Sequence, residues 1–259
     1  MKVIALPKRA IRFIDNKIRV HILDEYMVWR ARNILSKNET FMLNLPSHTI
    51  NENKKIWDSY DWSNGGEEWT LHSETYRGID PTRWKSELVN GMILKYIKNE
   101  STILEIGPGA GRWTEILQGF ARRLILADIS ERCLDICKQR FKESNNLEYH
   151  LIKNRLDFID DASIDFIWSY DVFVHINPTD IERYLECFQR ILKTGGCAII
   201  HHSGGYPNNY LRRASLLHFR SYMNGNLFAH LVRKYGMTLV EQNDTLTHLP
   251  YDLISVFYK

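Results

Sequence analysis

The stretch that decides the fold is Ile103-Leu104-Glu105-Ile106-Gly107-Pro108-Gly109-Ala110-Gly111. Its apolar beginning is typical of a buried strand, and the glycines that follow predict a tight loop ahead of a helix over residues 112–120. Glycine allows backbone angles and a close approach that a side chain would prevent. A helix that starts there directs its free N–H groups and its positive dipole end at a bound ligand. The stretch therefore predicts a nucleotide-like ligand at the carboxyl end of a strand.

Strand and helix patterns alternate from residue 101 onward. Short apolar runs bounded by turn residues predict strands buried on both faces of a parallel sheet, with helices between them. This alternation is typical of a doubly wound α/β fold. The predicted strands are 102–106, 123–127, 147–152, 164–169 and 196–201, the helices between them are 112–120, 131–143 and 178–192, and a helix over 81–97 precedes the first strand.

The C-terminal segment departs from this alternation. A helix is predicted over 223–235, and the strands predicted over 238–242 and 253–258 have only a loop between them. Parallel neighbours need a long crossover, so this short link predicts an antiparallel pair. We therefore expect a seven-stranded, mostly parallel sheet with an antiparallel C-terminal strand.

The chain ahead of the sheet has a different character. Residues 1–78 are predicted to form a helical, aromatic-rich extension, and residues 79–259 the α/β domain. Within the extension, Ile11, Ile14 and Ile18 recur at helical spacing among an excess of basic residues. This pattern predicts either a helical face packed on the main domain or a surface for a partner, and a homodimer through the N-terminal helices is one hypothesis.

The bulk composition excludes several classes of protein. Hydrophobic residues make up 44% and charged residues 25% of the 259 residues, which is the balance of a globular protein. A net charge of +3 is too small to indicate nucleic-acid binding, and no apolar run reaches the length of a membrane span. Four cysteines without zinc-site spacing predict reduced thiols, no metal site and a cytoplasmic location.

The spacing around the glycines distinguishes two kinds of cofactor loop. Gly107, Gly109 and Gly111 give G-x-G-x-G, whereas the nicotinamide and flavin fingerprint is G-x-G-x-x-G. Glu105 stands two residues before the first glycine, and Asp128 ends the second predicted strand. A carboxylate in the latter place can bind two ribose hydroxyls. This combination favours a nucleoside cofactor other than NAD.

These motifs resemble, in the same order, those of class I, Rossmann-like methyltransferases that use S-adenosylmethionine. The resemblance covers about residues 80–259 and includes the segments 163–169 and 192–196. It implies that the glycine loop wraps the amino-acid part of S-adenosylmethionine and that Asp128 holds its ribose. Many relatives carry an aspartate in place of Asn154, which with Arg155 and Leu156 is expected to border adenine. The other expected cofactor contacts are Glu105, Gly107, Pro108, Gly109, Gly111, Arg112, Trp113, Ile129 and Tyr170.

Aromatic side chains ahead of the sheet form a candidate cover for the cofactor. In such enzymes the chain before the first strand often lies over the cofactor, and aromatic faces attract cations such as a sulfonium. Trp69, Tyr76 and Trp84 are therefore expected either to stack near the sulfonium or to fill the core.

Histidines at the carboxyl ends of two predicted strands are candidates for a catalytic base. Methyl transfer is an in-line displacement in which the protein mainly positions the acceptor, and a hydroxyl acceptor also needs a base near neutral pH. His175 follows the fourth strand, and His201 and His202 end the fifth. Side chains alternate along a strand, so only one of the latter two faces the crevice, and we expect His202. Asp171 is expected to orient a histidine, bind the acceptor or contact the cofactor amine.

A long connection after the fifth strand, at about residues 204–222, predicts a lid over the acceptor. Arginines in such a lid can clamp a carboxylate or phosphate, which points to an anionic small-molecule acceptor. The substrate-binding candidates are Tyr206, Tyr210, Arg212, Arg213, Arg220 and Tyr222.

The resulting hypothesis is methyl transfer from S-adenosylmethionine to a small molecule, with a hydroxyl of a sugar or natural-product-like compound as the expected acceptor. This acceptor follows from a resemblance to bacterial polysaccharide and natural-product methyltransferases, and a fold alone does not identify a substrate. N- or S-methylation of a metabolite stays open, as do a NAD-dependent oxidoreductase and a non-catalytic binding protein. RNA methylation lacks support, because the sequence has no Asn-Pro-Pro-Tyr motif and no dense basic patch.

Overall fold

The computed structural model describes residues 49–153, 155–204, 221, 223–249 and 252–259. Three of the sequence predictions fall outside these residues. They are the N-terminal helices with their hypothetical homodimer contact, the adenine neighbour Asn154, and the lid residues Tyr206, Tyr210, Arg212, Arg213, Arg220 and Tyr222.

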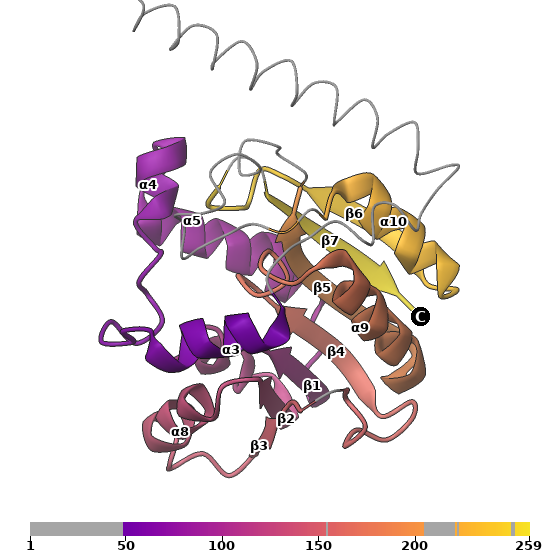
Figure 1. The fold of residues 1–259 in the computed structure, drawn as a ribbon, viewed down its shortest axis with the longest axis horizontal. Helices are drawn as coiled ribbons and strands as arrows, with labels where there is room; N and C mark the ends of the chain where they lie inside the picture. Colours follow the sequence, from indigo (N-terminus) through magenta and orange to yellow (C-terminus); the bar gives the residue numbers. More distant parts are fainter. Residues whose placement is uncertain (1–48, 154, 205–220, 222, 250–251) are drawn as a thin grey trace, which may run out of the picture.

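A seven-stranded sheet in the order β3-β2-β1-β4-β5-β7-β6 forms the centre of the molecule (Figure 1). Strands β1 to β5 are parallel, and β7 pairs antiparallel with both β5 and β6. The prediction of a mostly parallel sheet with an antiparallel C-terminal strand is thereby confirmed. The strands are β1 Ser101–Ile106, β2 Ala121–Asp128, β3 Leu147–Leu151, β4 Ile164–Ser169, β5 Leu192–Ser203, β6 Thr238–Asn243 and β7 Asp252–Tyr258.

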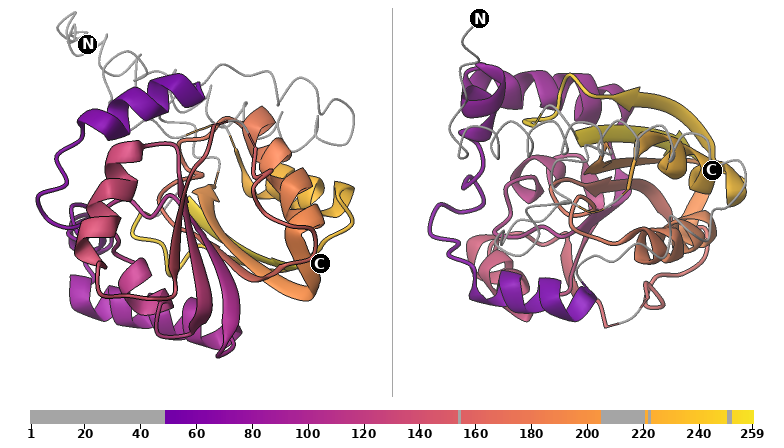
Figure 2. Two further views of the ribbon diagram at one scale, coloured as in Figure 1. Left: turned by 90° about the horizontal axis from the view of Figure 1, so that it is seen from below. Right: turned by 45° about the horizontal axis from the view of Figure 1, so that its top comes forward.

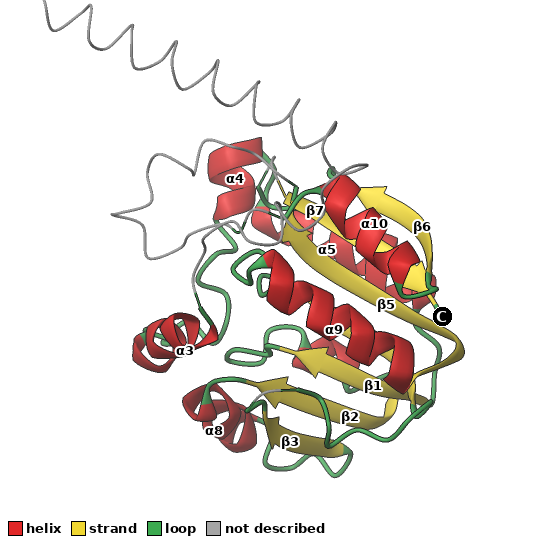
Figure 3. Ribbon diagram, turned by 45° about the vertical axis from the view of Figure 1, so that its right-hand side comes forward, coloured by secondary structure: helices red, strands yellow, loops and turns green. Residues whose placement is uncertain are grey.

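Helices cover both faces of the sheet (Figures 2 and 3). They are α3 Ile50–Ser59, α4 His72–Arg77, α5 Pro81–Leu88, the π-helical turn η1 Val89–Ile93, α6 Leu94–Tyr96, α7 Thr114–Leu117, α8 Glu131–Arg140, α9 Pro178–Ile191 and α10 Gly225–Lys234. One apolar cluster joins α9 and α10 to the sheet around Phe188 and Phe228. A second cluster joins α5, η1, α7 and α8 to the sheet around Trp84 and Trp168. None of these helices is long and apolar enough to cross a bilayer.

Local sequence signals set where the helices begin. Asn177 caps α9 through a 2.9 Å hydrogen bond that its Oδ1 accepts from the backbone N–H of Asp180. Ser130 caps α8 in the same way, and Asp80 caps α5. Each cap satisfies an N–H group that has no partner inside its helix. Because α8 follows β2 and α9 follows β4, these caps also fix the loops at the carboxyl ends of those strands.

Two predicted helices differ from the structure. The segment 112–120 contains only α7, because Gly119 and Phe120 donate to carbonyls three residues back and close the helix in tight turns. The segment 81–97 is interrupted by η1, in which the N–H of Leu94 donates to Val89 five residues back. Gly91 of η1 packs so closely that a Cβ there would lie 2.7 Å from Leu246. The periodicity of one helical segment does not predict such a contact with a distant segment.

Candidate functional site

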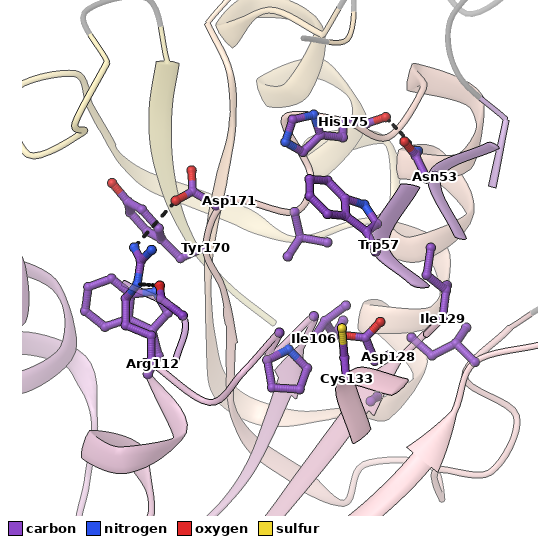
Figure 4. Close-up of a pocket in the computed structure, with 18 of the residues that line it drawn as sticks. Asn53, Trp57, Ile106, Arg112, Asp128, Ile129, Cys133, Tyr170, Asp171 and His175 are labelled. Carbon is purple, nitrogen blue, oxygen red and sulfur yellow. Dashed lines mark hydrogen bonds and ion pairs between the residues drawn. The ribbon is translucent and has the colours of Figure 1, made fainter. Parts of the chain in front are cut away.

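A pocket opens at the carboxyl ends of β1, β2 and β4, where open α/β sheets form their ligand crevice. The glycine loop forms part of its wall. Three other groups of side chains face the pocket from different sides (Figure 4). They are Asp128 with Ile129 and Cys133, Arg112 with Tyr170 and Asp171, and His175 with Asn53 and Trp57.

The glycine loop packs tightly against its neighbours. Gly107 and Gly109 have φ angles of 69° and 57°, in the left-handed region that favours glycine. A Cβ on Gly107 would lie 2.3 Å from Val172, and one on Gly109 would lie 2.9 Å from Trp62. The loop therefore offers its backbone, rather than side chains, to a ligand in the pocket.

Asp128 ends β2 with its side chain on the pocket wall, and it is only 6% exposed. Its Oδ1 accepts a 2.8 Å hydrogen bond from the backbone N–H of Ser130. Burial raises the pKa of Asp128 to about 6, while backbone hydrogen bonds from Ser130, Gly109 and Ile129 act in the opposite direction. A carboxylate on the wall can accept hydrogen bonds from the two hydroxyls of a ribose.

Glu105 lies beneath the glycine loop rather than on the pocket wall. Thr114 Oγ1 donates a 2.7 Å hydrogen bond to its Oε2, and Oε1 has no hydrogen-bond partner among the described residues. Burial raises the pKa of Glu105 to about 8, so the side chain carries a proton at neutral pH. Glu105 therefore supports the loop from below by joining β1 to α7, whereas the sequence led us to expect a direct cofactor contact.

Four aromatic side chains, Trp57, Tyr60, Trp62 and Trp69, form what we call the aromatic wall. Their neighbouring ring centroids lie 5.0 to 6.2 Å apart, and all except Tyr60 line the pocket. The wall begins in α3, which lies beside α8 (Figure 1). The chain ahead of the sheet thus covers one side of the pocket.

Two of the three aromatic residues predicted for the cover lie elsewhere. Trp69 lines the pocket, but Trp84 is completely buried in the second core cluster and Tyr76 is 53% exposed. The reason is that α5 turns Trp84 toward the sheet, whereas Tyr76 lies on the outer side of α4. Trp57 and Trp62 were not among the predicted cover residues, although both stand in the same aromatic-rich stretch.

A cation and an anion lie side by side on the wall next to Tyr170. Arg112 Nη1 lies 3.7 Å from Asp171 Oδ2, and Arg112 Nε donates to the carbonyl of Gly66. Burial by itself would raise the pKa of Asp171, but its interactions with His248, His201 and Arg112 outweigh burial and hold the pKa well below its usual value. An ionised carboxylate beside a guanidinium complements the ammonium and carboxylate groups of an α-amino acid.

His175 lies in the turn after β4, with its ring on the pocket wall. It is 5% exposed, and its ring centroid lies 5.1 Å from that of Trp57. Its backbone carbonyl accepts a 3.0 Å hydrogen bond from Asn53 Nδ2 of α3, and its N–H donates to the carbonyl of Val172. These contacts tie the turn to the cover, so that the imidazole borders the same space as the aromatic wall.

The two histidines that end β5 point to opposite faces of the sheet, and the structure places His202 away from the pocket. His202 Nε2 lies 2.7 Å from Ser255 Oγ, and its ring stacks on Phe228 of α10 at a centroid distance of 3.9 Å. Burial lowers the pKa of His202 to about 3. The expectation that His202 faces the crevice is therefore corrected. Strand alternation turns it to the α10 side and turns His201 toward Asp171.

The structure brings most of the other predicted cofactor residues together. On the pocket wall are Gly107, Pro108, Gly109, Arg112, Trp113, Asp128, Ile129 and Tyr170. Gly111 lies behind the loop, where a Cβ would be 2.4 Å from Phe141. Leu156 packs in the first core cluster and Arg155 pairs with Glu186, so neither lines the pocket, whereas Ile152 does.

A comparison with known families shows what the part of the chain around this pocket resembles. Residues 103–196 match the model of a family described as a methyltransferase domain. This part of the chain is therefore similar to a methyltransferase domain. The matched segment runs from β1 into β5 and includes the glycine loop, Asp128 and Asp171.

The chain also matches curated proteins over part of its length. The chain is 32% identical over 98 residues to the demethylmenaquinone methyltransferase of Tropheryma whipplei. The aligned region covers 38% of this chain and 40% of that protein. The chain spans less than half the length of the curated relatives it matches.

Solved structures extend the similarity over more of the chain. A TehB-like S-adenosylmethionine-dependent methyltransferase of Corynebacterium glutamicum matches with a TM-score of 0.51 and 21% identity, over 73% of this chain and 98% of that one. The N-methyltransferase NodS of Bradyrhizobium japonicum matches with a TM-score of 0.53 and 19% identity, over 68% and 96%. At such identities these neighbours show a shared fold. Together with the family match, they confirm the predicted resemblance to class I methyltransferases and the predicted fold.

Proposed function

We propose that the protein transfers a methyl group from S-adenosylmethionine to a hydroxyl of a small molecule, a sugar or a natural-product-like compound. The observation that carries this proposal is the pocket in which the glycine loop, Asp128 and His175 face a common space. The loop and Asp128 suit the cofactor. His175 suits a hydroxyl acceptor, because a hydroxyl has to lose its proton in the reaction.

The residues of the pocket fit S-adenosylmethionine along its length. The pair of Arg112 and Asp171 matches the carboxylate and ammonium groups of the amino-acid part, and Asp128 matches the ribose hydroxyls. Ile129 offers apolar surface to adenine. The aromatic wall presents ring faces that attract a sulfonium.

When bound, S-adenosylmethionine supplies an electrophilic methyl carbon attached to a positively charged sulfur. His175 accepts the proton of the acceptor hydroxyl on a ring nitrogen, so that the oxygen has an electron pair for the methyl carbon. Trp57 packs beside the imidazole and restricts its orientation. The aromatic wall excludes water and holds the acceptor in line, and such positioning alone accounts for much of the acceleration in a displacement of this kind.

Other parts of the proposal concern regions around the pocket. The extension up to residue 78 acts as a cover, which the position of α3 and the aromatic wall supports. The predicted lid at about 204–222 would bind an anionic acceptor through its arginines. We place the reaction in the cytoplasm, and the four buried free thiols suit such a reducing compartment.

N- or S-methylation of a metabolite is the second candidate. The structural neighbour NodS is named as an N-methyltransferase, and an amine acceptor would also release a proton near His175. To distinguish these candidates, S-adenosylmethionine with an isotopically labelled methyl group would be incubated with the full chain and a panel of sugars, phenols, amines and thiols. We expect the label on oxygen. Label on nitrogen or sulfur would replace the hydroxyl proposal with the second candidate.

The role of His175 is tested with the acceptor that this panel identifies. His175→Ala should keep the affinity for S-adenosylhomocysteine and lower turnover by about 100-fold or more, because it removes the general base. His150→Ala is the control, since His150 stacks on Phe158 outside the pocket. Near-normal turnover of His175→Ala would remove His175 from the proposed mechanism.

A further inference from the structure

A buried chain of polar residues leads from β7 through β5 to the pocket wall. His201 Nε2 lies 3.4 Å from Asp252 Oδ2, and the backbone N–H of Asp171 donates a 3.1 Å hydrogen bond to His201 Nδ1. His201 and Asp252 are 0% and 1% exposed, and neither lines the pocket. Strands β4, β5 and β7 are neighbours in the sheet (Figure 1), and Asp171 lies two residues after the end of β4. The chain of contacts therefore reaches the pocket through Asp171.

The hydrogen bond at His201 Nδ1 defines where the neutral ring carries its proton. Because Nδ1 accepts from the N–H of Asp171, the neutral ring has its proton on Nε2, which faces Asp252. The ring also stacks on Tyr170, with centroids 4.1 Å apart and an angle of 14° between the planes. The stacking and the two polar contacts together hold the imidazole in one orientation.

Asp171 is a residue that needs such support. Its φ is 63°, in the left-handed region that disfavours residues other than glycine. Its carboxylate lies 3.3 Å from His201 Nδ1, 3.4 Å from His248 Nε2 and 3.7 Å from Arg112 Nη1. Its backbone N–H donates to the same nitrogen of His201. Strained residues persist where the surrounding structure fixes them, and they gather at functional sites.

The cost of burying these polar groups also indicates that they have a functional role. Two carboxylates and two imidazoles lie together in the interior, away from most of the water that would otherwise stabilise them. Burying such groups is unfavourable unless they are paired, and a paired cluster beside a cleft is typical of a functional site. An apolar side chain at position 201 would have packed on Tyr170 equally well, so stacking alone does not explain a histidine there.

We propose that His201, oriented by Asp252, is a positioning residue that holds Asp171 in place so that its carboxylate meets the ammonium group of S-adenosylmethionine. The inference rests on the proposed function, since it needs this cofactor in the pocket. His201 acts through Asp171, whose backbone N–H and carboxylate it contacts, and it does not itself line the pocket. Its loss should therefore weaken recognition of the amino-acid part of the cofactor while leaving recognition of the nucleoside part intact.

The test compares two ligands by isothermal titration calorimetry on the full chain. S-adenosylhomocysteine has the amino-acid part, whereas 5′-methylthioadenosine has the same adenine, ribose and thioether without it. His201→Phe keeps a ring on Tyr170 but removes the acceptor for the Asp171 N–H. We expect this variant to lower the affinity for S-adenosylhomocysteine by about tenfold or more and the affinity for 5′-methylthioadenosine by less than about twofold. His201→Asn places an amide oxygen near the Nδ1 position, and it should keep both affinities within about threefold of the wild type.

His202→Phe is the matched control, because His202 is equally buried on the same strand and bonds to Ser203 and Ser255 instead. It should leave the ratio of the two affinities unchanged. Equal weakening of both ligands by His201→Phe, or an unchanged ratio, would overturn the inference.

A second variant keeps the inference testable if His201→Phe does not fold. Asp252→Ala, at the far end of the chain of contacts, should lower the preference for S-adenosylhomocysteine over 5′-methylthioadenosine, and an unchanged preference would overturn the inference. Wild-type protein that binds neither ligand would instead overturn the proposed function, and the inference with it. The two failures are thereby distinguishable.

Discussion

Two buried carboxyl groups near the glycine loop, Glu105 and Asp128, differ in what surrounds them. Burial raises the pKa of Glu105 to about 8 and that of Asp128 to about 6. Backbone N–H groups at the end of β2 donate hydrogen bonds to Asp128 and stabilise its ionised form. Among the described residues, Glu105 accepts a single side-chain hydrogen bond, from the hydroxyl of Thr114. The residue beneath the loop is thus neutral at pH 7, and the residue on the pocket wall is the one that can accept ribose hydroxyls as an anion.

His202 gives a prediction for the pH dependence of stability. Burial lowers its pKa in the folded protein to about 3, below the ordinary value of 6.5. As the pH falls below 6.5, the unfolded chain binds a proton that the folded protein does not, so the free energy of unfolding decreases. Between pH 7.5 and 5.5 this contribution should amount to about 1.4 kcal/mol.

The comparison variant for this prediction is His202→Gln, which can still hydrogen-bond to Ser255 but does not titrate. Urea unfolding of both proteins at pH 7.5 and 5.5 gives the difference in unfolding free energy at each pH. The wild type should lose about 1.4 kcal/mol relative to His202→Gln on going to the lower pH. A difference that is the same at both pH values would contradict a neutral, buried imidazole.

Several of the predicted cofactor residues that lie on the pocket wall are fixed by the end of a strand. Gly107, Gly109 and Asp128 follow or end a strand, so their positions depend on a short stretch of chain. The choice between His201 and His202 depends on how β5 pairs with β7 and which face α10 covers. Those partners lie far along the chain, and alternation alone does not say which face is which.

At the scale of the elements, the loop after β1 depends on close contacts as well as on backbone angles. Gly107 and Gly195 both have positive φ, 69° and 76°. A Cβ on Gly107 would meet Val172 at 2.3 Å, whereas a Cβ on Gly195 would meet nothing within 4 Å. Gly195→Ala should therefore cost about 1 kcal/mol of stability from backbone strain alone. Gly107→Ala should cost about 1–3 kcal/mol more, because Val172 and the turn after β4 have to move.

Denaturant unfolding of the two alanine variants measures this difference. Gly107→Ala should also weaken S-adenosylhomocysteine binding, since the displaced turn carries Asp171, whereas Gly195→Ala should leave binding unchanged. Equal losses of stability in the two variants would show that the close approach of the loop to Val172 contributes nothing.

The predicted bounds agree best with the structure for elements whose ends carry strong local sequence signals. The capped helices α8 and α9 begin where Ser130 and Asn177 predict, because a cap is decided by neighbouring residues. The π-helical turn η1 and the shortness of α7 were missed. Gly91 in η1 packs against Leu246, a contact between segments that periodicity within one segment does not contain.

At the scale of the whole molecule, link lengths explain why the topology of the sheet was predictable. Parallel neighbours require long crossovers, which the helices between β1 and β5 supply, and the link before β7 is short enough to predict an antiparallel neighbour. The way α3 brings Trp57 and Asn53 against the turn at His175 was not predictable, since it depends on contacts across more than a hundred residues. The domain boundary at residues 78–79 stays a prediction.

Ligand-dependent stabilisation of the full chain tests the central claim most directly, because a ligand stabilises the fold that binds it. S-adenosylhomocysteine at about 100 times its dissociation constant should stabilise the protein by about 2.7 kcal/mol, seen as a rise in Tm, and NAD should not. Asp128→Asn should need a concentration of S-adenosylhomocysteine about tenfold higher, or more, to give the same rise in Tm. Asp165→Asn, at the opposite end of the sheet beside Lys193, should need no more than the wild type. A rise in Tm with NAD and none with S-adenosylhomocysteine would contradict the account.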